Sequence, residues 1–330
     1  MAAESIAPKW VKAVVVSTII AAAIYLATVA WVGRLEVSAA LKLIRMDTLA
    51  ALLVLSCVNY ALRFGRWHYY LRILGSEISL PHNLRIYLGG FALTTTPGKA
   101  GEMARSLWLQ PYGVPACVSL AAFLVERIQD VLGIALLASL GASLYSSAHW
   151  LLLGCFGLIA LALAILHKPR LIESLLRPLA GRRASLLHAA RRVSEILALA
   201  RSCLSPLRFA VALLTGLLAW SAEAVAFWLL LKALGQPLPL PTAISIYALA
   251  MLAGALSFMP GGLGGTEAAM AILLRAIGVP LPVAVAATLL IRLTTLWFAV
   301  LLGIVALSIR AGTPRVLAAT TVAAAPVESI

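Results

Sequence analysis

The feature that most constrains this chain is a series of apolar runs, each about as long as the hydrocarbon core of a membrane is thick. An α-helix rises about 1.5 Å per residue, so roughly 20 consecutive apolar residues span a bilayer. With 62% hydrophobic and only 12% charged residues, the chain has too little polar material to coat a soluble domain of its length. We therefore expect an all-α integral membrane protein with about six transmembrane helices. The candidate spans are 11–32, 47–64, 116–145, 149–166, 207–233 and 282–309.

Two further apolar pieces are too short to cross comfortably, and each is followed by prolines and glycines and then by a second short helical piece. Non-helical backbone at membrane depth is tolerated only where protein or water surrounds it. This pattern predicts two re-entrant helical hairpins, at 83–110 and 242–277. Their breaks contain Pro97, Gly98, Gly101, Pro260, Gly261, Gly262, Gly264 and Gly265.

The two predicted hairpins belong to an internal repeat. With a constant shift of 165, the windows 102–127 and 267–292 are identical at eleven of twenty-six positions, including the first glutamate, a Gly-Val-Pro triplet and the last arginine. Each unit holds a span, a hairpin and a span, and one extra helix separates the units. The odd number of crossings predicts an inverted-topology repeat, an architecture of transporters. The expected segments are 1–46, 47–145, 146–206, 207–309 and a flexible tail, 310–330.

Lysine and arginine placement predicts the orientation of the chain. The loop 167–208 carries nine of them, so it should be cytoplasmic, and both termini then also lie inside. The loop 33–46 is an exception to this rule. Segment 182–203 mixes arginines with leucines and alanines, which predicts a basic amphipathic helix that contacts anionic lipids of the inner leaflet. We expect a multi-pass protein of the bacterial inner membrane.

Glu102 and Glu267 occupy matching places just after the two breaks, in the first turn of a short helix. A glutamate there can simply complement the helix dipole or cap the helix. Alternatively, the amides exposed at the breaks, with Lys99 and Arg105, cradle an anionic headgroup, and the glutamates pair with arginines or take up protons. Both interpretations stay open.

Arg127 and Arg292 lie about a third of the way into their predicted spans, where a guanidinium needs a compensating partner. Arg127 shares a helix face with Asp130, three residues on, whereas Glu126 should point elsewhere and find a partner on another helix. These arginines either tie a hairpin to a helix or bind phosphate, to which a guanidinium donates two parallel hydrogen bonds.

Two further groups of residues are candidates for lipid contact. Glu223 lies well inside the span 207–233 without a basic neighbour, so it should pair across helices or be protonated. Arg63, Arg66 and Trp67 fall where the span 47–64 ends, which predicts an interfacial anchor with snorkelling arginines that can also collect lipid phosphates.

Other chemistries lack a signature in the sequence. Cysteines and histidines stand singly, without the spacing of a zinc site or a disulfide framework, and no phosphate-binding GxxxxGK[ST] loop occurs. We expect no catalytic residue, metal or cofactor. The basic balance of 26 Lys and Arg against 12 Asp and Glu is that of cytoplasmic loops, so nucleic acid is not an expected partner.

Four motifs in order resemble the flippase-like membrane family, which includes the transmembrane region of lysylphosphatidylglycerol synthases. They read RxxRWxYYLRxLG, TPGKAGEMARSLWL, FLVERIQDVLGI and MPGGLGGTE with GVP. The resemblance covers about 10–310. It implies translocation of a lipid between leaflets and leaves the cargo open, because relatives are linked with aminoacylated phospholipids, hopanoids, cardiolipin or polyprenyl-phosphate sugars. No synthase domain is expected after Gly312. The hairpin and helix residues named above, with Glu126, Arg127 and Asp130, are those that carry over.

We therefore expect a lipid flippase or scramblase, not an enzyme, whose substrate is a phospholipid or a polyprenyl-phosphate-linked lipid. One alternative is a membrane partner that recruits a lipid synthase or glycosyltransferase through the basic loop. Another is a membrane-embedded lipid-modifying enzyme. Whether the protein forms a homo-oligomer stays open.

Overall fold

The computed structural model describes residues 44–96, 100–141, 148–168, 184–257, 259 and 261–309, besides the isolated positions 23, 27 and 42. Within these ranges the chain forms helices joined by turns, and no strand occurs. The expected all-α class is therefore confirmed. Most of the predicted span 11–32 and the tail 310–330 lie outside the described residues, as do Pro97, Gly98, Lys99 and Pro260.

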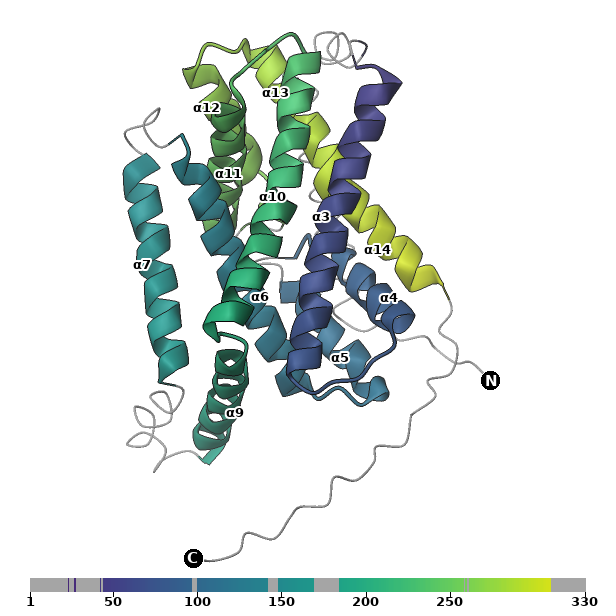
Figure 1. The fold of residues 1–330 in the computed structure, drawn as a ribbon. Helices are drawn as coiled ribbons and strands as arrows, with labels where there is room; N and C mark the ends of the chain where they lie inside the picture. The colour runs from purple at the N-terminus through teal and green to yellow at the C-terminus, as the bar shows by residue number, and fades with distance from the viewer. Residues whose placement is uncertain are drawn as a thin grey trace, which may run out of the picture.

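The helices follow one another with short connections (Figure 1). The first series comprises α3 (Met46–Ile73), α4 (Leu80–Phe91), a 3₁₀ segment (Ala100–Ala104), α5 (Arg105–Leu109), a second 3₁₀ segment (Gln110–Tyr112) and α6 (Ala116–Ser139). Two helices follow, α7 (Ala148–His167) and α9 (Ala184–Ser202). The second series comprises α10 (Pro206–Ala233), α11 (Leu240–Leu256), α12 (Gly265–Ala276), α13 (Leu281–Arg292), a π-helical segment (Leu293–Trp297) and α14 (Phe298–Ser308).

Four helical stretches are long and apolar enough to cross a membrane: Met46–Ile73, His149–His167, Pro206–Ala233 and Leu281–Ser308. The protein is accordingly a multi-pass membrane protein. The last stretch joins α13, the π-helical segment and α14 into one continuous rod. The helix α6 has 24 residues, but charged side chains interrupt its apolar character near the middle.

The helix α3 continues nine residues beyond the predicted end of its span at 64. The apolar run stops there, but the helix does not, because Arg63 and Arg66 pair with carboxylates inside the protein. The predicted span 116–145 was too long at its C-terminal end, because the helix α6 ends at Ser139.

The bounds of the two helix series follow the sequence alignment. Both α3 and α10 have 28 residues and begin 160 positions apart, at Met46 and Pro206. Each is followed by a glycine in the left-handed region, Gly75 with φ 77° and Gly235 with φ 74°. The helices α6 and α13 begin 165 positions apart. In Figure 1 the short helices α4 and α5 occupy the lower part of the molecule, and α11 and α12 the upper part.

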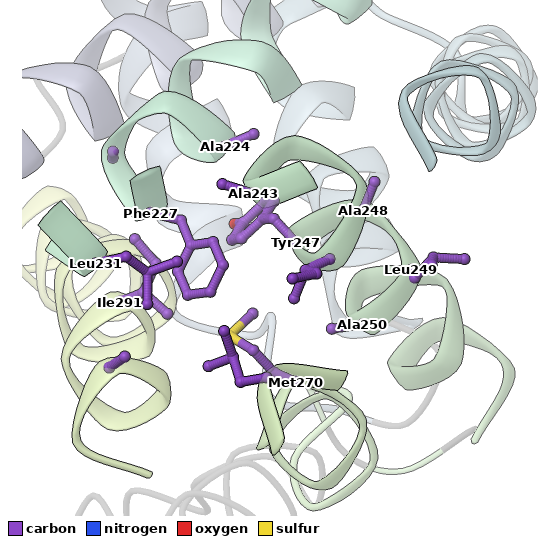
Figure 2. Close-up of a cluster of buried hydrophobic side chains, with 14 of the residues drawn as sticks. Ala224, Phe227, Leu231, Ala243, Tyr247, Ala248, Leu249, Ala250, Met270 and Ile291 are labelled. Atoms are coloured by element: carbon purple, nitrogen blue, oxygen red, sulfur yellow. The ribbon is translucent and has the colours of Figure 1, made fainter. Parts of the chain in front are cut away.

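The core of the second series lies where α10, α11, α12 and α13 meet (Figure 2). Phe227 from α10, Tyr247 from α11, Met270 from α12 and Ile291 from α13 are all at most 2% exposed. The first series has a more aromatic core, in which Phe64, Trp67, Tyr87 and Phe91 pack at ring-centroid distances of 5.2–6.1 Å. These two cores hold the helices on either side of the charged residues described below.

Close helix approaches depend on glycines at two places. A Cβ on Gly303 of α14 would overlap the backbone nitrogen of Ala92 and lie 2.9 Å from the carbonyl oxygen of Leu88, so α14 lies directly on α4. In the second break, Gly261, Gly262 and Gly264 adopt φ of 63°, 68° and 84°, a conformation that side chains with a Cβ rarely accept. The second break is thus a tight turn that only glycines form without strain.

The helix α9 confirms the predicted amphipathic character of segment 182–203. Its residues Ala190, Leu197 and Ala200 are buried, while Arg191 and Arg192 are exposed, and the helix packs against α6 and α7. The apolar face of α9 is therefore covered by protein. Its contact with an inner leaflet stays a prediction.

The approach of α14 to α4 gives a first prediction. We expect Gly303→Ala to lower the unfolding temperature in detergent, because the added methyl group meets backbone atoms and overpacking costs about 1–3 kcal/mol. Gly154→Ala in α7 is the matched control, since a Cβ there meets nothing within 4 Å and alanine favours the helix. Equal unfolding temperatures for the two variants would contradict this packing.

A second prediction concerns Cys203, between α9 and α10. Burial raises the pKa of its thiol to about 11, so almost no thiolate exists at neutral pH. In a protein whose other cysteines are replaced, we expect maleimide to label Cys203 far more slowly than the exposed thiol of a Ser202→Cys, Cys203→Ala variant. The rate at Cys203 should rise with pH as the thiolate forms. Similar labelling rates at neutral pH would contradict the burial.

Candidate functional site

A network of buried ion pairs centres on α6. Glu126 and Asp130, one turn apart on this helix, both contact Arg66 of α3. The Nη2 atom of Arg66 donates a hydrogen bond to Oδ1 of Asp130 and lies 3.6 Å from Oε1 of Glu126. The Arg66 and Glu126 side chains have no exposed surface. These pairs fasten α3 to α6 where neither charge reaches solvent.

The first break joins the same network. Arg105 of α5 donates from Nε to the carbonyl oxygen of Glu102 at 3.0 Å and from Nη2 to its Oε2 at 3.2 Å. Oε1 of Glu102 accepts from the hydroxyl of Thr94 at 3.0 Å. Arg105 also lies 3.6 Å from Glu126, and its guanidinium stacks 4.4 Å from the ring centroid of Trp67. The break is thereby fixed to both α3 and α6.

Arg127 has three carboxylates around it. Its Nη2 lies 2.9 Å from Oδ2 of Asp130, 3.6 Å from Glu126 and 4.0 Å from Glu102. The predicted shared face of Arg127 and Asp130 is confirmed, as is the prediction that Glu126 pairs with other helices. The expectation that Glu126 points away from Arg127 was wrong, because the long arginine side chain reaches back along the helix to it.

The second break uses a simpler arrangement. Arg292, the last residue of α13, donates from Nε to Oε1 of Glu267 at 2.7 Å and from Nη2 to the carbonyl oxygen of Gly261 at 2.8 Å. The other carboxylate oxygen of Glu267 accepts from the backbone N–H of Gly264, the N-cap residue of α12, at 2.7 Å. Glu267 therefore caps its helix and pairs with an arginine, so both expected roles are combined.

Glu223 pairs across helices, as expected. Its Oε2 accepts a hydrogen bond of 2.6 Å from the hydroxyl of Tyr247 on α11. In the first series, Tyr87 donates to Glu126 at 3.3 Å. Tyr87 and Tyr247 are equivalent in the sequence alignment, at a shift of 160. Both series thus place a tyrosine hydroxyl on a buried carboxylate.

The predicted interfacial anchor is wrong for Arg63, Arg66 and Trp67. All three are buried, at 5%, 2% and 1% exposure. The carboxylates of α6 offset the desolvation of the arginines, and the indole N–H of Trp67 donates to Asn83 at 3.0 Å. These side chains therefore face the protein interior and not the headgroups.

Sequence reasoning missed several polar residues that complete the site. Asn59 of α3 donates to the carbonyl oxygen of Ala219 in α10 at 2.8 Å, and the indole N–H of Trp220 donates to Asp130 at 3.1 Å. The hydroxyl of Tyr60 donates to the carbonyl oxygen of Thr295, in the π-helical segment. The sequence signal that could have identified Asn59 and Tyr60 is a polar side chain within an apolar run.

A cavity of about 50 Å³ lies between the two helix series. Arg63, Thr94 and Glu102 line it from the first series, and Glu223 and Arg292 line it from the second. A larger cavity of about 260 Å³ is lined by Arg127 and Asp130 on one side and by the glycines of the second break on the other. The two breaks approach each other directly, since a Cβ on Gly261 would lie 3.3 Å from the Cα of Thr95.

The site brings together most of the predicted residues. Glu102, Arg105, Glu126, Arg127 and Asp130 belong to one network, and Glu267 and Arg292 to a second pair beside it. Gly101 packs against Leu93 and Thr96, while Gly265 packs against Ser257. Among the residues that the structure describes, no group of three or more His, Cys, Asp or Glu side chains is arranged to hold a metal ion.

Buried charges at the meeting of two helix series, within a bundle of membrane-spanning helices, define a polytopic membrane protein with a polar interior. The chain belongs to the family described as the lysylphosphatidylglycerol synthase TM region, whose model matches residues 11–303. The resemblance noted in the sequence is thereby confirmed. No curated protein matches the chain.

The charge network gives a third prediction. Asp130→Asn keeps the shape of the side chain but removes the charge that Arg63, Arg66 and Arg127 share, and we expect a loss of about 3–5 kcal/mol of unfolding free energy. Equilibrium unfolding in mixed SDS micelles measures it. Asp47→Asn, which breaks only the exposed pair with Arg45, is the control and should unfold like the wild type. Equal stability of the two variants would show that the network contributes nothing.

Proposed function

We propose that this protein moves the headgroup of a phospholipid or of a polyprenyl-phosphate-linked lipid between the leaflets of the membrane. Membership of the lysylphosphatidylglycerol synthase TM region family supports a role with membrane lipids. The observation that carries the proposal is the pair of cavities between the two helix series. Arginines and carboxylates of both series line the smaller cavity, and Arg127 and Asp130 line the larger one.

The physical problem of lipid translocation is the headgroup, since its charge is costly to place in hydrocarbon. A polar interior lowers that barrier while the acyl or prenyl chains remain in the bilayer. Arginines suit the task because a guanidinium binds phosphate oxygens through two parallel hydrogen bonds. Arg63 and Arg292 line the smaller cavity and Arg127 lines the larger one. The proposal assigns the protein no covalent chemistry.

We further propose that the two series form an inverted repeat and that α4–α5 and α11–α12 are re-entrant hairpins. The equal lengths of α3 and α10, the matching start positions and the paired glycines Gly75 and Gly235 support a repeat. The placement of one short helix pair in the lower part of the molecule and of the other in the upper part supports inversion (Figure 1). Such repeats meet near the bilayer midplane in transporters.

A difference between the two halves suggests how access changes. Arg292 holds Glu267 at 2.7 Å, whereas the equivalent Arg127 lies 4.0 Å from Glu102 and turns instead to Asp130 at 2.9 Å. The second break is therefore held closely by Arg292, whereas Arg105, and not Arg127, makes the closest contact with Glu102 of the first break. In the proposed cycle the two halves rock against each other, and Arg127 exchanges Asp130 for Glu102 as the first break closes.

The setting of the protein is part of the proposal. The loop that contains α9 lies on the cytoplasmic side of a bacterial inner membrane, together with both chain termini. The exposed Arg191 and Arg192 of α9 contact anionic lipids there, where each basic residue contributes about 1 kcal/mol near the surface. The same loop is the surface that a lipid synthase or glycosyltransferase would use.

Reconstitution into vesicles tests the function. With a fluorescent phosphatidylglycerol, Arg127→Gln and Arg292→Gln should each slow translocation roughly tenfold or more, the loss expected from one charge-assisted hydrogen bond. Arg72→Gln, an exposed arginine of α3, is the matched control and should retain the wild-type rate. Size-exclusion chromatography checks the folding of each variant.

Two outcomes contradict the proposal. Wild-type rates in both folded variants would place the headgroup path elsewhere. A change in the mass of lipids incubated with the pure protein would instead indicate a lipid-modifying enzyme.

A further inference from the structure

The arginines and carboxylates of the first series do not balance. Within the part of the chain that the structure describes, the ion pairs centred on α6 join four arginines with three carboxylates, which leaves one positive charge in excess. The arginines are Arg63, Arg66, Arg105 and Arg127, and the carboxylates are Glu102, Glu126 and Asp130. Glu223 of the second series lines the same cavity as Arg63, so this excess does not by itself require an anion, and the unused hydrogen-bond donors carry the inference.

Arg63 is the least compensated of the four arginines. Among the described residues its single ion pair, with Asp130, is 3.7 Å long, and that carboxylate is already engaged by Arg66 and by Arg127 at 2.9 Å. Its Nε and Nη2 atoms find no hydrogen-bond acceptor among the described residues, although the side chain is only 6% exposed. These unused donors belong to a side chain that lines the 50 Å³ cavity.

The surroundings of Arg63 hold the guanidinium in place for a ligand. It lies 5.4 Å from the ring centroid of Trp220 and 5.9 Å from that of Phe91, on opposite helix series. The cavity beside it far exceeds the roughly 10–15 Å³ that one water molecule needs. A phosphate group therefore has both donors and room.

We propose that this cavity binds a single phosphodiester group, a monoanion, of the transported lipid, and that Arg63 is its principal donor. The inference rests on the proposed function and names the substrate class within it. The substrates are thus lipids whose phosphate links two alcohols, whether glycerophospholipids or polyprenyl-phosphate sugars.

The carboxylate of Glu223 gives the cavity its selectivity. It lines the same cavity as Arg63 and accepts a hydrogen bond from Tyr247. A phosphomonoester carries about −1.5 to −2 charges at neutral pH, and Glu223 repels the second charge. Phosphatidic acid, polyprenyl monophosphates and free phosphate are excluded for this reason.

Binding to the detergent-solubilised protein tests the inference, with the ligand-induced shift in unfolding temperature as the readout. The probes are dihexanoyl phosphatidylglycerol as the diester, dihexanoyl phosphatidic acid as the monoester lipid and inorganic phosphate as the free anion. The diester should stabilise the wild type, and the other two should not. Arg63→Gln should weaken diester binding about 10- to 100-fold, as expected for a lost charge-assisted hydrogen bond, whereas Arg72→Gln should bind like the wild type.

Glu223→Gln provides a second test, independent of whether Arg63→Gln folds. It should raise the affinity for phosphatidic acid more than the affinity for phosphatidylglycerol. The preference for the diester over the monoester then becomes smaller, and loss of structure does not produce this change. The inference is overturned if folded Arg63→Gln binds the diester like the wild type, if the three probes bind the wild type equally or not at all, or if Glu223→Gln leaves the preference unchanged.

Translocation in vesicles separates this inference from the proposed function. If diester binding requires Arg63 but the protein does not translocate that lipid, the proposed function is refuted and the binding site stands. Translocation at the wild-type rate by Arg63→Gln would refute the site and leave the function.

Discussion

The structure depends on the pairing of the α6 carboxylates with arginines from two other helices. An isolated charge inside a membrane-spanning bundle is costly, and its removal from water is offset only when partners stand at close range. Glu126 and Asp130 meet that condition with Arg66 from α3 and Arg105 from α5. Once these pairs form, the relative positions of α3, α5 and α6 are determined. The walls of both cavities follow from that arrangement.

The second half of the molecule solves the same packing problem with fewer charges. Where the first half has Asp130, the equivalent position in the second half is Thr295, whose hydroxyl bonds to the carbonyl oxygen of Ile291 within its own helix. Arg292 contacts Glu267 and a backbone carbonyl. Glycines at positive φ then bring the second break close to the first. The helices α3 and α10 therefore have equal lengths and end in matching glycine turns, but the polar contacts of the two halves differ.

The sequence predicted the helices better than it predicted the partners of their charged residues. The length of an apolar run predicts a membrane-spanning helix, and the alignment of the two halves predicts where the equivalent helices begin. Both can be read from the sequence without knowledge of the fold. The end of α3 was misplaced since the run of apolar residues stops at Arg63, while the helix continues to Ile73.

The burial of Arg63 and Arg66 could not be read from local sequence. Their main partner Asp130 is 64 or more positions away, and only the fold brings it within reach. Glu223 was correctly expected to pair across helices, yet no local pattern pointed to Tyr247. The alignment of Tyr87 with Tyr247 did contain that signal, because one repeat equivalent contacts a glutamate in each half.

The order of the charged partners along the chain has a consequence for biogenesis. The ion-pair partners of Glu126 and Arg127 on other elements are Arg66, Glu102 and Arg105, and all of them precede α6. When the ribosome delivers α6 to the translocon, its counter-charges have already been synthesised. The helix α6 can therefore leave the translocon together with the helices that precede it, without waiting for the second half of the chain.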